Sequence, residues 1–118
     1  ANGYLIDQFL RDGSNRRSGP YGGSMNNRAR FLLEVLGEVI SVWGSDRVGL
    51  RLSPLNSYNS MKDSDPVGLT KFLARELNRL GHQVRVLLPG FGAGPRSMRI
   101  MEAFLRRRGH RADHLGGT

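Results

Sequence analysis

The chain has 118 residues, which is enough for one small domain. It contains no cysteine, and this excludes disulfides and metal sites built on thiolates. No apolar run approaches the ~20 residues that span a bilayer, and no signal peptide is apparent. We therefore expect a cytoplasmic protein that acts without a membrane.

The net charge is +8, and among the 18 basic residues only Lys62 and Lys71 are lysines. A chain this basic raises the question of nucleic-acid binding. Its arginines are scattered over predicted helix faces, apart from the run 106–108, which is typical of a solvated helix end. No nucleic-acid-binding signature accompanies them. We expect no specific nucleic-acid partner, and a weak, salt-sensitive association stays open.

The first half of the chain alternates between strand and helix patterns. Residues 1–9 are apolar and predict a strand, and the glycine-rich stretch 10–23 predicts a loop of a length that is usually functional or disordered. Ser24 suits an N-cap, and apolar residues at helical spacing predict a helix that ends at Gly44. The stretch "RVGLRLSP" predicts a strand in which Val48, Leu50 and Leu52 face one way and Gly49, Arg51 and Ser53 the other.

The second half continues the alternation. Asp65 and Pro66 are a strong start signal for a second helix, which Gly81 ends. "QVRVLLPG" predicts a strand, residues 95–108 predict a third helix, and the residues after it suggest a further strand. Strands that alternate with helices predict an α/β fold with a parallel sheet and right-handed crossovers.

Three polar residues lie where such a fold places ligands. Arg51 is near the carboxyl end of its predicted strand and faces away from the apolar side. Asn2 and Tyr4 are two residues apart, so on a strand they would share a face. The residues alone leave two alternatives open, namely a surface or ion-paired arginine and a tyrosine packed at the end of a strand.

The stretch 1–31 closely resembles the signature of the Old Yellow Enzyme family of FMN-dependent ene-reductases, nearest to the branch of N-ethylmaleimide reductase. The matching motifs are "NGYL", "QF", "SNRR", "YGGS" and "NRARF", and the resemblance continues through "RVGLRLSP" and "YNSM" over about residues 1–80. Gly19, Pro20 and Asn26 depart from the family pattern, at positions that belong to loop and cap details.

The resemblance implies a (β/α)8 TIM barrel, of which residues 1–81 would form a part, with FMN at the carboxyl ends of the strands. It implies that Tyr4 is the proton donor, that Asn2 binds the substrate carbonyl, and that Tyr58 lines the substrate pocket. Arg51 would lie beside the flavin and favour its reduced, anionic form. The implied substrates are α,β-unsaturated carbonyl compounds such as enones and maleimides, and the implied reductant is NADH or NADPH.

In the family, the strand that leads to Asn2 begins several residues earlier and carries a second carbonyl-binding side chain. We therefore expect that the chain is cut within a strand and holds about three of the eight barrel units expected for this fold. An incomplete cavity predicts that the isolated chain is inactive and does not bind FMN tightly. The open alternative is a non-catalytic, small basic α/β domain or fusion product.

Residues 82–118 depart from the family and resemble the start of an α/β-hydrolase, or a divergent segment. In such enzymes the position of Phe91 lends a backbone N–H to an oxyanion hole. No G-x-S-x-G motif is present, so hydrolase activity is not expected. The glycines at 90, 92 and 94 lack the spacing of a dinucleotide fingerprint, and we interpret them as a turn.

Overall fold

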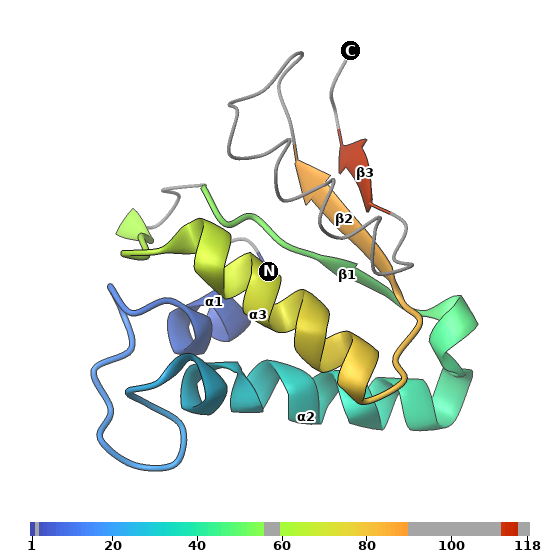
Figure 1. Cartoon of the computed structure of the whole chain (residues 1–118), viewed down its shortest axis with the longest axis horizontal. Helices are drawn as coiled ribbons and strands as arrows, with labels where there is room; N and C mark the ends of the chain where they lie inside the picture. The colour runs from blue at the N-terminus through green and yellow to red at the C-terminus, as the bar shows by residue number, and fades with distance from the viewer. Residues whose placement is uncertain (2, 56–59, 90–111, 116–118) are drawn as a thin grey trace.

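A computed structural model describes residues 1, 3–55, 60–89 and 112–115. Three helices lie in this part of the chain, α1 (Leu5–Leu10), α2 (Met25–Trp43) and α3 (Pro66–Arg79), with a 3-10 turn, η1, at Ser45–Arg47 (Figure 1). The strands are β1 (Gly49–Arg51), β2 (Arg85–Pro89) and β3 (Ala112–Leu115). Among these residues, no helix combines the length and hydropathy that crossing a bilayer requires.

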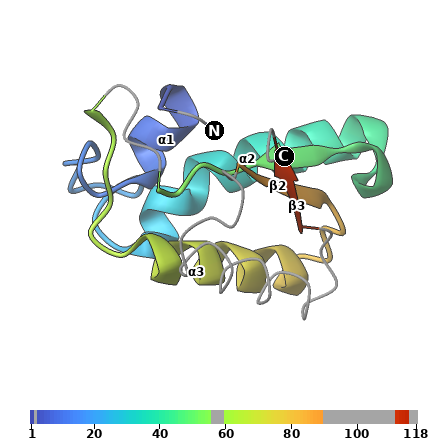
Figure 2. The same ribbon diagram turned by 90° about the horizontal axis from the view of Figure 1, so that it is seen from above.

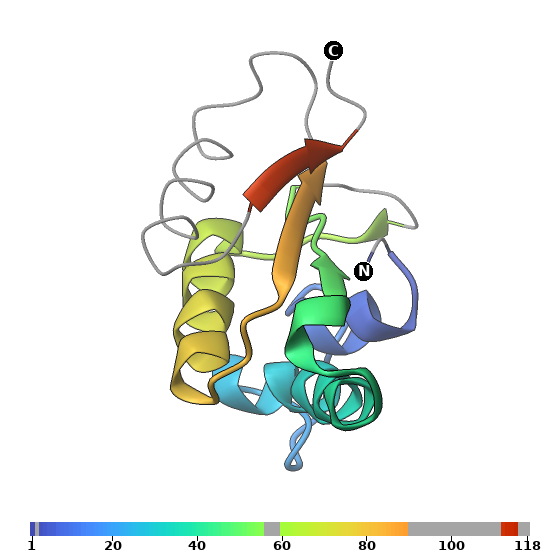
Figure 3. The ribbon, with the colours of Figure 1, turned by 90° about the vertical axis from the view of Figure 1, so that its right-hand side faces the viewer.

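The three strands form a parallel sheet in the order β1-β2-β3 (Figure 3). Leu50 lies opposite Val86 between the first two strands, and Leu87 lies opposite Asp113 between the second and third. The helices α2 and α3 run alongside one another next to these strands (Figure 2). The predicted parallel α/β class is confirmed, including a strand after residue 109, whereas closure into a barrel stays a prediction.

One face of β1 and β2 packs on the helices, and the other, which we call the open face, carries exposed residues. On the covered face Leu50, Val86 and Leu88 are buried, and they join the helix residues Leu32, Leu36, Leu69, Leu73 and Leu77 in one hydrophobic core. The neighbouring strand residues, Gly49, Arg51 and Arg85, are exposed. Burial of this core is the main favourable term of folding. Arg51 and Arg85 lie on the open face.

The helix boundaries follow the predicted signals. The Ser24 side chain accepts a hydrogen bond from the Asn27 backbone at 3.2 Å, and α2 ends at Gly44, whose φ of 82° suits glycine. The Asp65 carboxylate accepts from the Gly68 backbone at 3.0 Å, with Pro66 as the first helical residue. Each cap satisfies a backbone N–H that the helix itself leaves without a partner.

The predicted strand over residues 1–9 is wrong, because Leu5–Leu10 forms the helix α1. Gly3 has a φ of 85°, which breaks an extended backbone, and Tyr4 is the N-cap of the helix. The apolar run alone did not distinguish a strand from a short helix that packs against α2. Asn2 therefore cannot share a strand face with Tyr4, and Asn2 itself lies outside the described residues.

A second correction concerns Ser53, which was expected on the same face as Arg51. The strand β1 ends at Arg51, and Ser53 is 1% exposed. The alternation of faces therefore stops where the regular strand stops. Tyr58, Phe91 and the predicted helix at 95–108 lie outside the described residues.

Candidate functional site

Arg51 is the last residue of β1, and its side chain is exposed. The alternation on β1 buries Leu50 on the helix side and directs Arg51 to the open face. An arginine keeps its charge at any physiological pH and can approach an anion from this position. The geometry thus leaves a permanent cation at the carboxyl end of a parallel strand, where α/β folds bind ligands.

The amino end of the chain lies against this strand end. The Ala1 amine donates a hydrogen bond to the Arg51 carbonyl at 2.6 Å, although the two residues are 50 positions apart. The contact brings the segment that carries Tyr4 next to Arg51.

Tyr4 is 60% exposed and lines an open, mainly apolar groove. The groove has a volume of about 470 Å³, and its other lining residues are Ala1, Leu5, Ile6, Phe31 and Val35. Ala1 therefore contacts Arg51 on one side and contributes to the groove of Tyr4 on the other. Ala1 thus links the backbone of Arg51 to the groove of Tyr4, whereas the Arg51 side chain does not line that groove.

A buried ion pair lies directly behind Tyr4. The Asp7 carboxylate accepts from the Gly3 backbone at 2.7 Å and from the Arg11 guanidinium at 3.3 Å, and both charged side chains are 2% exposed. The same guanidinium nitrogen of Arg11 donates to the Ser53 carbonyl. This cluster joins the start of α1, the end of α1 and the segment after β1.

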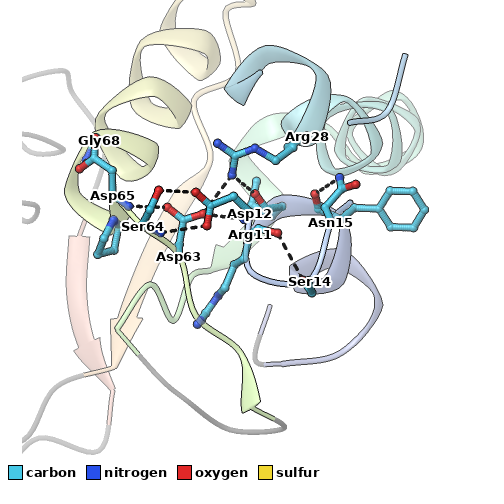
Figure 4. Close-up of polar contacts among 12 residues, drawn as sticks. Arg11, Asp12, Ser14, Asn15, Arg28, Asp63, Ser64, Asp65 and Gly68 are labelled. Atoms are coloured by element: carbon cyan, nitrogen blue, oxygen red, sulfur yellow. Dashed lines mark hydrogen bonds and ion pairs between the residues drawn. The ribbon is translucent and has the colours of Figure 1, made fainter. Parts of the chain in front are cut away.

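A second buried ion pair, between Arg28 and Asp63, holds the loops before α2 and α3 together (Figure 4). Arg28 Nη1 donates to Asp63 Oδ1 at 3.0 Å and to the Leu10 carbonyl at 2.8 Å. Asp63 also accepts from the Asp12 backbone at 2.8 Å, and Asp12 accepts from the Ser64 backbone at 2.9 Å. We call these four residues, Arg28, Asp63, Asp12 and Ser64, the loop junction.

The Ser64 hydroxyl also donates to the Asp12 carboxylate, and this hydrogen bond is the main reason that the pKa of Asp12 is lowered. The loop junction is an assembly of paired polar groups. Within the described residues, no group of three or more histidine, aspartate or glutamate side chains is placed to bind a metal ion.

The glycine-rich loop is ordered by Asn15. Its side-chain amide donates to the Phe9 carbonyl at 2.5 Å and to the Tyr21 carbonyl at 2.7 Å. Arg17 stacks over the Phe9 ring at 4.0 Å from its centre, and Phe9 stacks on Phe31 at 4.6 Å. Tyr21 donates to Glu34 at 2.7 Å, which raises the pKa of its phenol.

Sequence reasoning missed Asp7, Arg11, Arg28 and Asp63. A signal was available for Asp7, because it is the third residue of α1, a position from which an acidic side chain reaches back to the preceding backbone. Arg28 and Asp63 are 35 residues apart, and no spacing rule links them.

Comparisons with known proteins agree on one family. Residues 1–86 match the model of the NADH:flavin oxidoreductase / NADH oxidase family. A probable flavin mononucleotide-dependent alkene reductase of Leishmania infantum is 59% identical over 78 residues, which are 66% of this chain and 21% of that protein. A putative 12-oxophytodienoate reductase 11 of Oryza sativa subsp. japonica is 53% identical over 81 residues, 69% of this chain and 22% of that protein.

A solved structure of morphinone reductase in complex with tetrahydroNAD has the same arrangement of elements. It aligns with 99% of this chain at 32% identity with a TM-score of 0.72, and the alignment covers 37% of its own chain. The chain thus spans about a fifth of the length of the two curated relatives above and somewhat over a third of this solved structure.

Proposed function

Because the chain belongs to the NADH:flavin oxidoreductase / NADH oxidase family, we propose that it forms part of an FMN-dependent reductase of activated alkenes in which Tyr4 donates the proton. The family match confirms the resemblance to the Old Yellow Enzyme family. The observation that carries the proposal is the 2.6 Å contact between the Ala1 amine and the Arg51 carbonyl, which sets the Tyr4 segment against the carboxyl end of β1.

FMN, when bound, supplies a hydride to the β-carbon of the alkene. Tyr4 delivers the proton to the α-carbon, which an exposed phenol at the rim of an apolar groove is suited to do. Arg51 would hold the cofactor, because its exposed guanidinium keeps a positive charge that would favour a reduced, anionic flavin. Asn2 would donate to the substrate carbonyl and Tyr58 would line the pocket, as the family resemblance implies.

We propose α,β-unsaturated carbonyl compounds, such as enones and maleimides, as substrates and NADH or NADPH as the reductant. Two observations support this class. The Leishmania relative is a probable alkene reductase by name, and the groove beside Tyr4 is mainly apolar. An apolar wall with a few polar groups is the usual composition of a small-molecule site.

We also propose that residues 1–81 are the reductase-derived unit and that 82–118 are a hydrolase-like or divergent segment. The curated matches above extend over 78 and 81 residues of this chain, and the family match ends at residue 86. The strand β2 begins after this boundary and still pairs in register with β1, so the second segment extends the sheet of the first.

The proposed function is tested by a chimaera. Residues 1–81 of this chain replace the matching segment of the Leishmania relative, and the purified protein is loaded with FMN. We expect it to reduce N-ethylmaleimide or cyclohexenone with NADPH or NADH. Tyr4→Phe should slow reoxidation of the reduced flavin by the alkene ~10²–10⁴-fold, as loss of a general acid does, and leave flavin reduction unchanged.

Tyr21→Phe is the matched control, because its phenol is bound to Glu34 and lies outside the groove. Equal effects of the two tyrosine variants, or none from Tyr4→Phe, would contradict the role of Tyr4. A separate titration of the 118-residue chain with FMN tests the expectation that it lacks tight binding by itself. A sub-micromolar dissociation constant would be the contrary result.

A further inference from the structure

The backbone around Tyr4 is fixed by groups behind it. Tyr4 is the N-cap residue of α1, and its side chain makes no capping hydrogen bond. The preceding residue, Gly3, is buried and has a φ of 85°. Its N–H donates to Asp7 Oδ2 at 2.7 Å. Asp7, the third residue of the helix, thus fixes the backbone that leads into Tyr4.

Asp7 is in turn held by Arg11. Their side chains meet at 3.3 Å, and the Arg11 guanidinium also donates to the Ser53 carbonyl, two residues beyond the end of β1. The chain of contacts therefore runs from the Gly3 backbone, through two charged side chains, to the backbone that follows Arg51. These contacts join the segment of Tyr4 to the segment of Arg51, and the two segments carry the proposed site.

Stability alone does not explain this pair. A buried ion pair contributes little to stability compared with apolar side chains of the same volume, because both charges lose their hydration. The pair instead fixes the relative position of the groups that it joins, because a carboxylate and a guanidinium form hydrogen bonds of defined geometry. Here the bonds at both ends go to backbone groups that flank the site.

We propose that Asp7 and Arg11 are positioning residues that set the place of Tyr4 relative to the carboxyl end of β1 and hence to Arg51. The functional part of this inference rests on the proposed role of Tyr4 as proton donor. Misplacement of a reacting group by about 1 Å can cost ~100-fold in rate, so a fixed backbone matters for an exposed side chain. Both side chains of the pair are buried, and neither lines the groove beside Tyr4.

The test uses the full 118-residue chain with fluorotyrosine at its three tyrosines, Tyr4, Tyr21 and Tyr58. The variant Tyr4→Phe assigns the Tyr4 fluorine resonance, and Tyr21, held by Glu34, is the internal reference. In Asp7→Ala and in Arg11→Ala we expect the Tyr4 resonance to sharpen and move toward that of the free amino acid. The Tyr21 resonance should stay in place.

Amide exchange gives a second readout. In Asp7→Ala, exchange of the Gly3 amide should rise at least ~10-fold, while amides in the middle of α2 keep their rates. Asp7→Asn retains an oxygen that can accept from Gly3, so it should restore most of the Tyr4 signal. Arg11→Lys retains the charge without the fork of the guanidinium, and it should restore less.

A purely structural role predicts a different pattern. The Tyr4 and Tyr21 resonances would then move together, in proportion to the loss of unfolding free energy, and this result would overturn the proposal, as would an unchanged Tyr4 signal in all variants. If the alanine variants fail to fold, Asp7→Asn and Arg11→Lys are compared instead. The proposal then requires that the Tyr4 resonance moves more in Arg11→Lys than in Asp7→Asn while the Tyr21 resonance stays in place. Neither flavin nor alkene is present, so failure of the catalytic role of Tyr4 is detected separately in the chimaera.

Discussion

The loop junction and the strand end with Tyr4 and Arg51 are built in opposite ways. In the loop junction, the charged side chains of Arg28 and Asp63 are 6% and 1% exposed and bond to one another and to backbone groups. At the strand end, Tyr4 is 60% exposed and Arg51 is also exposed. Both regions belong to the same family resemblance. The difference separates buried residues that hold the loops in place from residues whose side chains reach the surface.

The comparison also explains why a long glycine-rich loop is compatible with a defined site. Residues 11–24 have little regular structure, but Asn15 bridges two carbonyls across the loop and Arg28 bonds the Gly23 carbonyl at 3.1 Å. These side chains satisfy backbone groups that neither helix nor strand would satisfy. A loop fixed in this way can support α1, and α1 carries Tyr4 at its start.

The largest effect is expected from breaking the buried ion pair of the loop junction. Arg28→Ala leaves the Asp63 carboxylate buried without its cation and the Leu10 carbonyl without its donor. We expect the free energy of unfolding to fall by about 3–5 kcal/mol, as measured by urea denaturation. Arg28→Lys should lose less, since it keeps the charge.

Arg16→Ala is the control for that measurement, because Arg16 is an exposed arginine of the neighbouring loop. It changes the net charge by the same amount and should alter stability by less than about 0.5 kcal/mol. If the two alanine variants were equally stable, the loop junction would not be the rigid region that we infer.

A smaller effect is expected from a methyl group added at Gly22. A Cβ at this position would lie 2.2 Å from the Arg17 carbonyl oxygen and 2.5 Å from the Arg17 Cβ. The overlap is with backbone, so the loop itself must shift, and Gly22→Ala should cost about 1–3 kcal/mol. Gly19→Ala, in the same loop, meets nothing within 4 Å and should be nearly neutral. Urea denaturation of the pair gives the contrast, and equal stability of the two variants would show that the loop adapts freely.

A pH-dependent effect is expected at Asp12. The Ser64 hydrogen bond lowers the pKa of Asp12 in the folded chain below its ordinary value of 3.8. Asp12 therefore contributes stability above pH ~4 that is lost as the pH falls through the lowered pKa. Ser64→Ala should be less stable than the parent chain at pH 7, by less than about 1 kcal/mol because the site is largely exposed.

The difference between parent and Ser64→Ala should shrink as the pH falls through the lowered pKa of Asp12, because the carboxylate then becomes protonated in both proteins. Thermal unfolding at several pH values measures it. A difference that stays constant from pH 7 to pH 3 would mean that the hydrogen bond acts through packing and not through the charge of Asp12.

Much of the fold could be predicted because the signals were local. Ser24 and Asp65 cap their helices as expected, and Gly44 and Gly81 end them with φ values of 82° and 74°. The alternation around Leu50 correctly placed Arg51 on the exposed face. Such signals depend on neighbours in sequence, and one chain is enough to interpret them.

The errors have a common physical origin in contacts between distant residues. The helix α1 depends on Gly3 and Asp7 and on packing against α2, so a short apolar run gave the wrong element. The Arg28–Asp63 and Arg11–Ser53 contacts join residues 35 and 42 positions apart. Motif resemblance marked the regions in which they lie, but it did not distinguish supporting residues from reacting ones.

The smallest effect on stability is expected at the site itself. Tyr4→Phe and Arg51→Met keep most of each side chain, and both residues are exposed, so unfolding free energies should change by less than about 0.5 kcal/mol. Arg28→Ala is expected to lose unfolding free energy. Together, the two results would show that stability and the proposed chemistry depend on different residues of the family signature. A loss above about 2 kcal/mol in Tyr4→Phe would instead show that the phenol is part of the scaffold, because substitutions at exposed sites without a structural role rarely cost so much.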